Sequence, residues 1–190
     1  MRITCYFDYT CSYSYRAWLW FERLGTTEEL EVNWSSFVLK EINRQEGEIS
    51  ALVGPTIESV AALALALGEA LRGHDGWERY HAATFRAMHS GEERPGADDI
   101  IRLAAEAGLD VDEFRNDQAR WLAAVRASHV DGVERLGVFG TPTLVFDNDA
   151  AIYLKLQGLP TGDDHKLWDS LTAIGRSFPA VVELKRPQLS

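Results

Sequence analysis

Strand-like segments at both ends of the chain flank a long central stretch of helical periodicity, and this arrangement limits the folds available. Near the N-terminus, 2–8 and 30–39 are short and rich in β-branched and aromatic residues. Between them, 12–24 carries apolar residues with the spacing of one helix face. The polar stretch 40–50 follows, and then a helical block. Its predicted helices are 57–72, 77–90, 98–107 and 112–136, the last with a break.

The C-terminal part returns to strands. A turn and a short apolar strand occupy 137–149, an alternating strand occupies 151–158, and a closing helix is predicted over 163–178. The order is therefore strand–helix–strand, a helical block, and strand–strand–helix. Because only two short strands follow the block, we predict a single α/β sheet and no second domain with its own sheet.

Composition limits the partners. The 190 residues are 46% hydrophobic, which supports a folded core, and the net charge of −10 disfavours nucleic acid or an anionic membrane as a partner. The first residues lack the apolar region of a signal peptide, and no apolar run reaches the roughly 18 residues of a membrane span. We therefore expect a cytoplasmic protein with no membrane partner.

The stretch Phe7–Tyr15, FDYTCSYSY, contains a C-x-x-S motif. Cys11 lies where the first strand passes into the first helix, and the positive end of a helix favours the thiolate form of a cysteine. Ser14 follows one turn later and can donate a hydrogen bond to a thiolate, but it cannot resolve a mixed disulfide. Alternatively, Cys11 is only a small buried apolar residue, and Ser12 and Ser14 cap the helix.

The segment FGTPTLVF contains a second candidate feature, the Thr141-Pro142 pair before a strand. An X-Pro bond can be cis, and such a turn brings backbone groups beside a substrate. An ordinary trans turn is the alternative.

Other candidates are weaker. Cys5, six residues before Cys11, lies roughly 20 Å away if the chain is extended, too far for a disulfide. We interpret His81 as a surface or boundary residue, with a place in a cleft as the alternative. His74, His81 and His89 can share one side of a helical stretch, but their spacing does not indicate a metal site.

Taken together, these features resemble the DsbA-like branch of the thioredoxin superfamily. Within it, the chain is similar to the group of FrnE, 2-hydroxychromene-2-carboxylate isomerases and kappa-class glutathione transferases. The segments that carry this resemblance are the C-x-x-S start, His81–Phe114 and Gly137–Asp147. It implies a thioredoxin fold with a helical domain inserted between the βαβ and ββα halves. The thioredoxin-like domain would comprise 1–50 and 137–190, and the inserted domain 51–136.

The resemblance also implies roles for single residues. Cys11 matches the nucleophilic cysteine, Ser14 matches the resolving cysteine, and Pro142 matches the cis-proline. Ser12 and Tyr13 match the dipeptide that tunes the site, and Thr141 precedes the proline. Redox-active members usually have a Cys-Pro-Trp-Cys site, whereas this chain has Cys-Ser-Tyr-Ser. Kappa transferases and the isomerases match Ser14 but commonly have serine in place of Cys11.

We therefore expect a monothiol oxidoreductase that exchanges disulfides through Cys11, with Ser14 stabilising the thiolate. Ser12, Tyr13, Thr141 and Pro142 would bind the substrate or thiol. The substrate would be a small thiol or disulfide, or protein thiols. No tightly bound cofactor or metal is expected, and glutathione or mycothiol would be the co-substrate. Two alternatives are a thiol-dependent transferase or isomerase and a catalytically silent binding module. The oligomeric state stays open, with a homodimer as one option.

Overall fold

The N-terminal strand–helix–strand unit forms half of the sheet. The computed structural model describes residues 1–25, 30–91 and 93–186. Strand β1 (Arg2–Phe7) leads into helix α1 (Ser12–Gly25), and β2 (Glu31–Ser36) returns parallel to β1. Parallel neighbours need a crossover connection, and α1 provides it. The register places Ile3 opposite Val32.

The C-terminal strands complete the sheet in the order β2-β1-β3-β4. Strand β3 (Thr143–Val145) lies antiparallel to β1, and β4 (Ala151–Tyr153) lies antiparallel to β3. The observed β4 is shorter than the strand predicted over 151–158. Helix α8 (Asp164–Ser177) follows, and the Asp163 side chain caps its start. The predicted α/β thioredoxin-type fold class is therefore confirmed.

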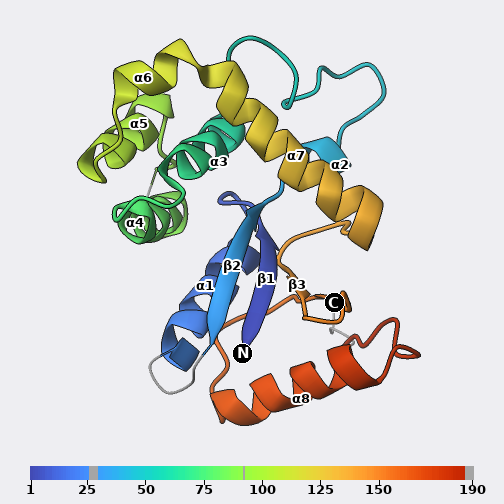
Figure 1. The fold of residues 1–190 in the computed structure, drawn as a ribbon. Coiled ribbons are helices and arrows are strands. Elements are labelled where there is room, and N and C mark those ends of the chain that lie inside the picture. Colours follow the sequence, from blue (N-terminus) through green and yellow to red (C-terminus); the bar gives the residue numbers. More distant parts are fainter. Residues whose placement is uncertain (26–29, 92, 187–190) are drawn as a thin grey trace.

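All the other helices lie between β2 and β3 in the chain. They are α2 (Leu39–Ile42), α3 (Val60–Leu71), α4 (Trp77–Ser90), α5 (Ala97–Glu106), α6 (Val111–Asn116) and α7 (Gln118–Leu136). Figure 1 shows α3 to α7 gathered at the end of the sheet where β1 leads into α1, with α8 at the opposite end. The break expected within 112–136 occurs at Asp117, between α6 and α7. The division into two domains stays a prediction.

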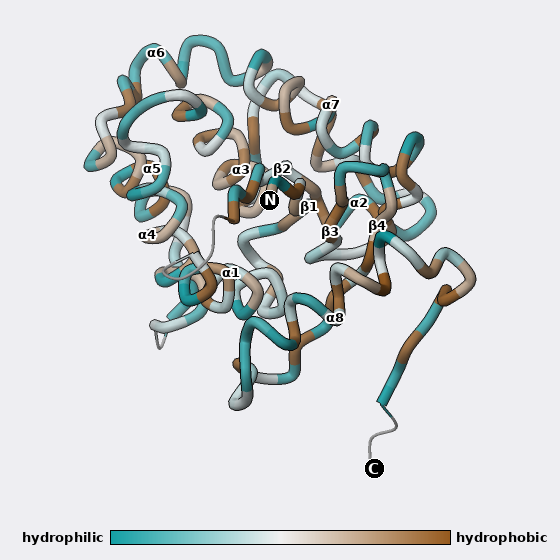
Figure 2. Tube along the Cα trace, turned by 60° about the horizontal axis from the view of Figure 1, so that its bottom comes forward, coloured by the Kyte–Doolittle hydropathy of each residue, from teal (hydrophilic) through white to brown (hydrophobic). Residues whose placement is uncertain are grey.

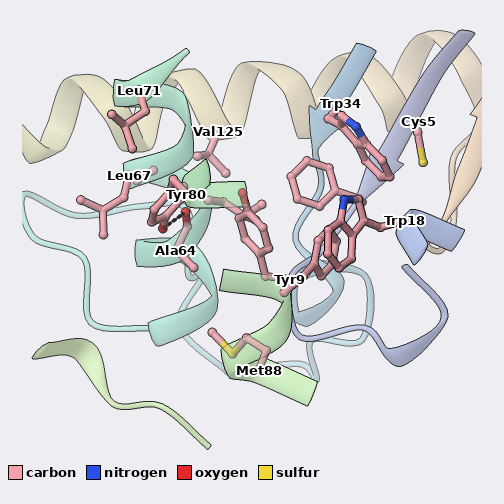
Figure 3. Packing of buried hydrophobic residues seen from close by; sticks show 14 of the residues in the cluster. Cys5, Tyr9, Trp18, Trp34, Ala64, Leu67, Leu71, Tyr80, Met88 and Val125 are labelled. Carbon is pink, nitrogen blue, oxygen red and sulfur yellow. Dashed lines mark hydrogen bonds between the residues drawn. The ribbon is translucent and has the colours of Figure 1, made fainter. Parts of the chain in front are cut away.

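Helix α3 is the centre of the helical block. Its sequence VAALALALGEAL is apolar on nearly all sides, and such a helix must be covered on all sides. It packs against α7, α5 and α4. Gly68 allows the Tyr9 hydroxyl to approach closely, since a Cβ there would lie 3.3 Å from that oxygen. Figure 3 shows Leu67 and Tyr80 in the same cluster as Trp18 and Trp34, so one core runs from the sheet into the helices.

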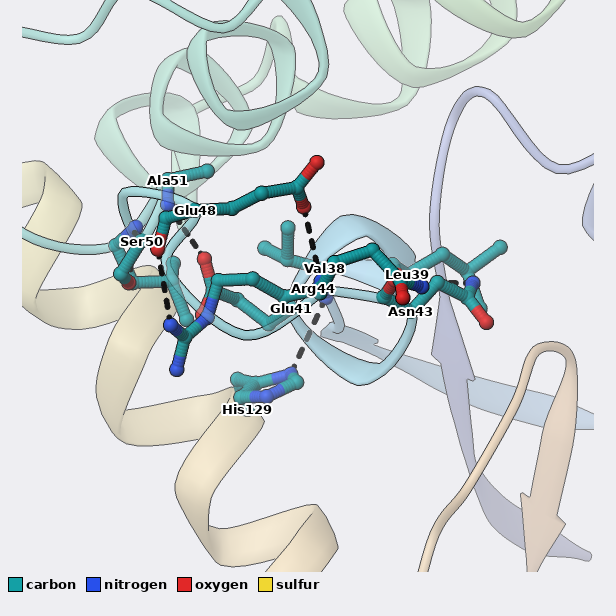
Figure 4. Close-up of polar contacts among 11 residues, drawn as sticks. Val38, Leu39, Glu41, Asn43, Arg44, Glu48, Ser50, Ala51 and His129 are labelled. Atoms are coloured by element: carbon teal, nitrogen blue, oxygen red, sulfur yellow. Dashed lines mark hydrogen bonds and ion pairs between the residues drawn. The ribbon is translucent and has the colours of Figure 1, made fainter.

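Polar contacts fix the segment that follows β2. The backbone N–H of Val38 donates to Nδ1 of His129 at 3.3 Å, and the N–H of Ala51 donates to the Glu41 carboxylate (Figure 4). His129 belongs to α7, so this helix holds the end of β2 in place. Helix α2 was not predicted, because its four residues are too few to show a period.

After α8 the chain leaves the body of the protein. Val182 and Leu184 are 94% and 82% exposed. Figure 2 shows the chain after α8 extending outward, with apolar positions in brown along it. Across the described ranges, the helices are too short or too polar to cross a membrane.

Candidate active site

Cys11 lies at the N-terminal end of α1, as the sequence predicted. Its N–H donates to the carbonyl oxygen of Asp8 at 3.0 Å, which closes the turn after β1. Its own carbonyl accepts the N–H of Tyr15 at 3.1 Å, the first hydrogen bond of the helix. Cys11 therefore occupies the N-cap position of α1, directly before the first-turn amide groups that have no acceptor within the helix. It is 8% exposed.

The thiol of Cys11 contacts the proline segment directly. Its Sγ donates to the carbonyl oxygen of Thr141 at 3.2 Å, and the bond from Thr141 to Pro142 is cis. The carbonyl of Pro142 accepts the N–H of Leu154 at 2.9 Å, which ties this segment to the chain after β4. The structure thus brings together the two motifs that the sequence singled out, although 130 positions separate Cys11 from Thr141.

The remaining residues of the C-x-x-S motif differ in environment. Ser12 is exposed and Tyr13 is half-buried. Ser14 is fully buried, and its Oγ has no hydrogen-bond partner within the described part of the chain. The expected hydrogen bond from Ser14 to the sulfur is therefore not observed. The protonated thiol acts as a donor here, and the Thr141 carbonyl receives its hydrogen.

Three residues near the thiol were not identified from the sequence. The guanidinium carbon of Arg16 lies 5.4 Å from the Tyr13 ring centroid, and Nζ of Lys155 lies 4.8 Å from the same centroid. The third residue, Tyr153, lies close enough to Lys155, Cys11 and Tyr13 for their charges to shift the pKa of its hydroxyl. Burial raises its pKa most, Lys155 lowers it, and Cys11 and Tyr13 raise it. Arg16 lies one turn after Tyr13, but the register that places Lys155 here cannot be read from the sequence.

A buried carboxylate supports the turn before Cys11. The Asp8 side chain accepts hydrogen bonds from the N–H and Oγ1 of Thr10 and from the N–H of Leu39, at 2.7 to 2.9 Å. Burial raises the pKa of this carboxyl, and these hydrogen bonds oppose the shift. The three donors fix the backbone on both sides of the turn.

Tyr9 connects the same turn to α4. Its hydroxyl lies 2.9 Å from Nδ1 of His81, and its carbonyl oxygen lies 2.8 Å from Nε2 of His89. His81 is 2% exposed and packs between the rings of Trp77 and Trp34, with centroids at 4.5 and 4.7 Å. The interpretation of His81 as a surface or boundary residue was wrong, because these rings enclose it. Burial lowers the pKa of His81 well below its usual range.

Cys5 is a buried thiol of the sheet. It lies in β1 opposite Leu144 of β3, and it is free, like Cys11. Burial raises the pKa of Cys5, and the charge of Cys11 adds to this effect. The arrangement agrees with the prediction that the two cysteines do not form a disulfide.

Known proteins are similar to this chain over most of its length. The family model described as "DSBA-like thioredoxin domain" matches residues 2–161. A curated protein of Mycobacterium tuberculosis (strain ATCC 25618 / H37Rv), "Uncharacterized protein Rv2286c", is 26% identical over 96% of this chain and 80% of its own length.

Two solved structures are similar in fold. A probable DsbA oxidoreductase, SCO1869 from Streptomyces coelicolor, has a TM-score of 0.67 and 20% identity, covering 100% of this chain and 94% of that one. A thioredoxin-like oxidoreductase from Silicibacter pomeroyi DSS-3 has a TM-score of 0.58 and 20% identity, covering 90% of this chain and 84% of that one.

Proposed function

Because this chain belongs to the DSBA-like thioredoxin domain family, a family of thiol-disulfide oxidoreductases, we propose that it exchanges disulfides through a single cysteine, Cys11. The observation that carries this proposal is the position of the Cys11 sulfur. It lies at the start of α1 and 3.2 Å from the Thr141 carbonyl oxygen, beside the cis peptide bond to Pro142. Amide groups at a helix start stabilise a thiolate, and the thiolate is the nucleophile of disulfide exchange.

The reaction has two exchange steps. The Cys11 thiol loses its proton to solvent, and the thiolate attacks one sulfur of a disulfide. The S–S bond breaks, the other half leaves as a thiolate, and Cys11 is left in a mixed disulfide. An external thiol then attacks the substrate sulfur, so that Cys11 leaves with the electron pair.

The external thiol is needed because Ser14 cannot perform the second step. A hydroxyl does not displace a thiolate from a disulfide, and Cys5 lies buried within β1. We propose a low-molecular-weight thiol, glutathione or mycothiol, as this co-substrate. Small disulfides or protein thiols would be the substrates, and the cytoplasm, which keeps such thiols reduced, would be the location.

The residues around the Cys11 sulfur would stabilise the thiolate and hold the bound thiol. They are Ser14, Ser12, Tyr13, Thr141 and Pro142. The Ser14 hydroxyl would donate to the thiolate, and the exposed Ser12 and half-buried Tyr13 would contact the bound thiol. The backbone of Thr141 and Pro142 would hold the sulfur-bearing group in place.

Site-directed removal of each cysteine tests the mechanism. The wild type, Cys11→Ala and Cys5→Ala would be incubated with a small disulfide and excess thiol. Turnover and the mass of each cysteine-containing peptide would be measured. We expect Cys11→Ala to lose turnover and the mixed-disulfide adduct, and Cys5→Ala to keep both. Turnover by Cys11→Ala equal to that of the wild type would show that the mechanism is wrong.

The same variant separates the alternative chemistry. A thiol-dependent isomerase or transferase would act on small aromatic substrates only with added thiol, and it would continue to do so in Cys11→Ala. A silent binding module would show no turnover in either assay.

A further inference from the structure

Two cations converge on one aromatic ring of the C-x-x-S motif, that of Tyr13. Arg16 and Lys155 lie 5.4 and 4.8 Å from the centroid of Tyr13, which is two residues after the cysteine. The Nη1 of Arg16 also donates to the carbonyl oxygen of Leu156 at 2.9 Å, which holds α1 against the segment after β4. The cluster thus joins two separate parts of the chain.

These two cations differ from most arginines of the protein in having no carboxylate partner. Among residues 1–25, 30–91 and 93–186, neither Arg16 nor Lys155 forms an ion pair. In the same ranges, ion pairs to carboxylates are made by Arg2, Arg23, Arg44, Arg72, Arg102, Arg115, Arg120, Arg135 and Arg176. The Tyr13 ring attracts both cations but does not neutralise them. In a chain of net charge −10, they place two positive charges without carboxylate partners at the Tyr13 ring, two residues after Cys11.

The register of the sheet explains how Lys155 comes close to the residues of the Cys11 site. Tyr153 pairs with Thr143, and the N–H of Leu154 donates to the Pro142 carbonyl at 2.9 Å. If this antiparallel register continues past the end of β4, Lys155 lies beside Thr141. The carbonyl oxygen of Thr141 accepts the hydrogen bond from the Cys11 thiol. Lys155 follows β4 by two positions and lies close enough to Tyr153 to lower the pKa of its hydroxyl, and the charges of Cys11 and Tyr13 act on the same hydroxyl.

We propose that Tyr13, Arg16, Tyr153 and Lys155 form an anion subsite that selects sulfur substrates with a carboxylate close to the reacting sulfur. The carboxylate would accept charge-assisted hydrogen bonds from Lys155 and Arg16, and the tyrosine rings would flank the organic part. This inference rests on the proposed function, and it decides between the two co-substrates named above. Glutathione carries carboxylates and mycothiol carries none, so the subsite favours glutathione or another carboxylate-bearing thiol.

The selectivity is tested by comparing two chromogenic disulfides. Dithiobis(nitrobenzoic acid) carries a carboxylate on each ring, and dithiodipyridine is neutral at pH 7.5. Each reacts with the Cys11 thiolate to give a mixed disulfide and one released aromatic thiolate. The rates would be measured in a Cys5→Ser background, and the ratio of the anionic to the neutral probe is the readout. A change in the amount of thiolate alters both rates equally and cancels from this ratio.

We expect Lys155→Gln to lower the ratio by about threefold to tenfold at low salt, and Lys155→Glu to lower it further. The loss should shrink in salt of about 0.5 M, because exposed charges are screened. The control is Lys166→Gln, which changes the net charge equally. Lys166 is exposed in α8, two residues after Asp164. Asp164 pairs with Arg23, which lies about 18 Å from Cys11 along α1 at 1.5 Å per residue. Lys166→Gln should therefore leave the ratio unchanged.

The outcomes separate the two proposals. If Cys11 reacts with both probes and Lys155→Gln lowers the ratio no more than Lys166→Gln, the anion subsite is refuted and the monothiol mechanism stands. If Cys11 reacts with neither probe, the monothiol mechanism fails and the subsite fails with it. A lower ratio in Lys155→Gln alone supports both.

Discussion

Replacing Ser14 by alanine should make the protein more stable and its thiol less reactive. The Ser14 hydroxyl is fully buried and unpartnered in the described structure, while the Cys11 thiol donates to Thr141. While the Cys11 thiol is protonated, the Ser14 hydroxyl therefore carries an uncompensated desolvation cost. After the thiol loses its proton, the sulfur becomes an acceptor, and the hydroxyl one turn away can donate to it.

The expected magnitudes follow from these two states. A buried unpaired polar group costs about 1–3 kcal/mol, and alanine is also the better helix former, so Ser14→Ala should raise the free energy of unfolding by about 1 kcal/mol. A hydrogen bond to a charged group contributes about 1.5 kcal/mol at the low end, which is roughly tenfold in thiolate population. A less stabilised thiolate is also a better nucleophile, so the net fall in exchange rate should be about threefold.

Two measurements check these values. Urea unfolding of the reduced proteins should move the midpoint of Ser14→Ala upward by about 0.5 M, for a slope of about 2 kcal/mol per molar. Stopped-flow reaction with dithiodipyridine should show that Cys11 reacts more slowly in Ser14→Ala than in the wild type. Ser36→Ala is the matched control for stability, because Ser36 is equally buried but donates to Glu69. It should lose stability.

If Ser14→Ala lowered the free energy of unfolding by about 1 kcal/mol or more, the reasoning about stability would be refuted. Such a loss would mean that the Ser14 hydroxyl has a hydrogen-bond partner while the Cys11 thiol is protonated. An unchanged exchange rate would refute the role of the hydroxyl toward the thiolate.

Three further predictions concern the site and its supports. Ser14→Cys should form a reversible disulfide with Cys11, since residues one turn apart lie within disulfide range; mass spectrometry would detect the loss of two hydrogens. His81→Gln should flatten the fall in the free energy of unfolding at acid pH. Burial lowers the pKa of His81 in the folded state, so the unfolded state takes up a proton first as the pH drops below about 6.5. In the wild type, this group therefore lowers the free energy of unfolding by up to about 1.4 kcal/mol per pH unit. Gly132→Ala should lower the free energy of unfolding by about 1–3 kcal/mol, because its Cβ would lie 2.8 Å from the Tyr6 ring.

Each of these has a control and a contradicting result. A disulfide-free Ser14→Cys protein under oxidising conditions would exclude the expected geometry. His74→Gln alters an exposed histidine and should keep the wild-type pH profile; an unchanged profile in His81→Gln would contradict the buried neutral imidazole. Gly25→Ala adds a Cβ with nothing within 4 Å, so a loss equal to that of Gly132→Ala would contradict the packing argument.

The sequence predicted the elements that have a clear period or a clear cap. The interval 77–90 coincides with α4. Asp110 accepts the N–H groups of Asp112 and Glu113 at the start of α6, the capping pattern typical of an aspartate before a helix. It also identified the two segments that meet at the sulfur. Both successes depend on local pattern or on the resemblance to a known family.

The errors and omissions share a different cause, which is contact between distant parts of the chain. His81 is buried by Trp34, and Lys155 reaches Tyr13 through the register of β3 and β4. The hydrogen bond expected from Ser14 was not observed because Thr141, far along the chain, receives the thiol hydrogen instead. None of these partners can be read from spacing in one sequence.

The burial of Tyr9 means that the helical block is a structural part of the thiol site and cannot be treated as a detachable accessory. The ring of Tyr9 packs on Tyr80 and Phe85, with centroids at 6.1 and 4.9 Å, and its backbone accepts from His89. All three belong to α4. A minimal protein made by joining β2 directly to β3 would expose these aromatic contacts and release the turn that holds Cys11. Engineering of this protein should therefore vary the helical block in place and leave α4 intact.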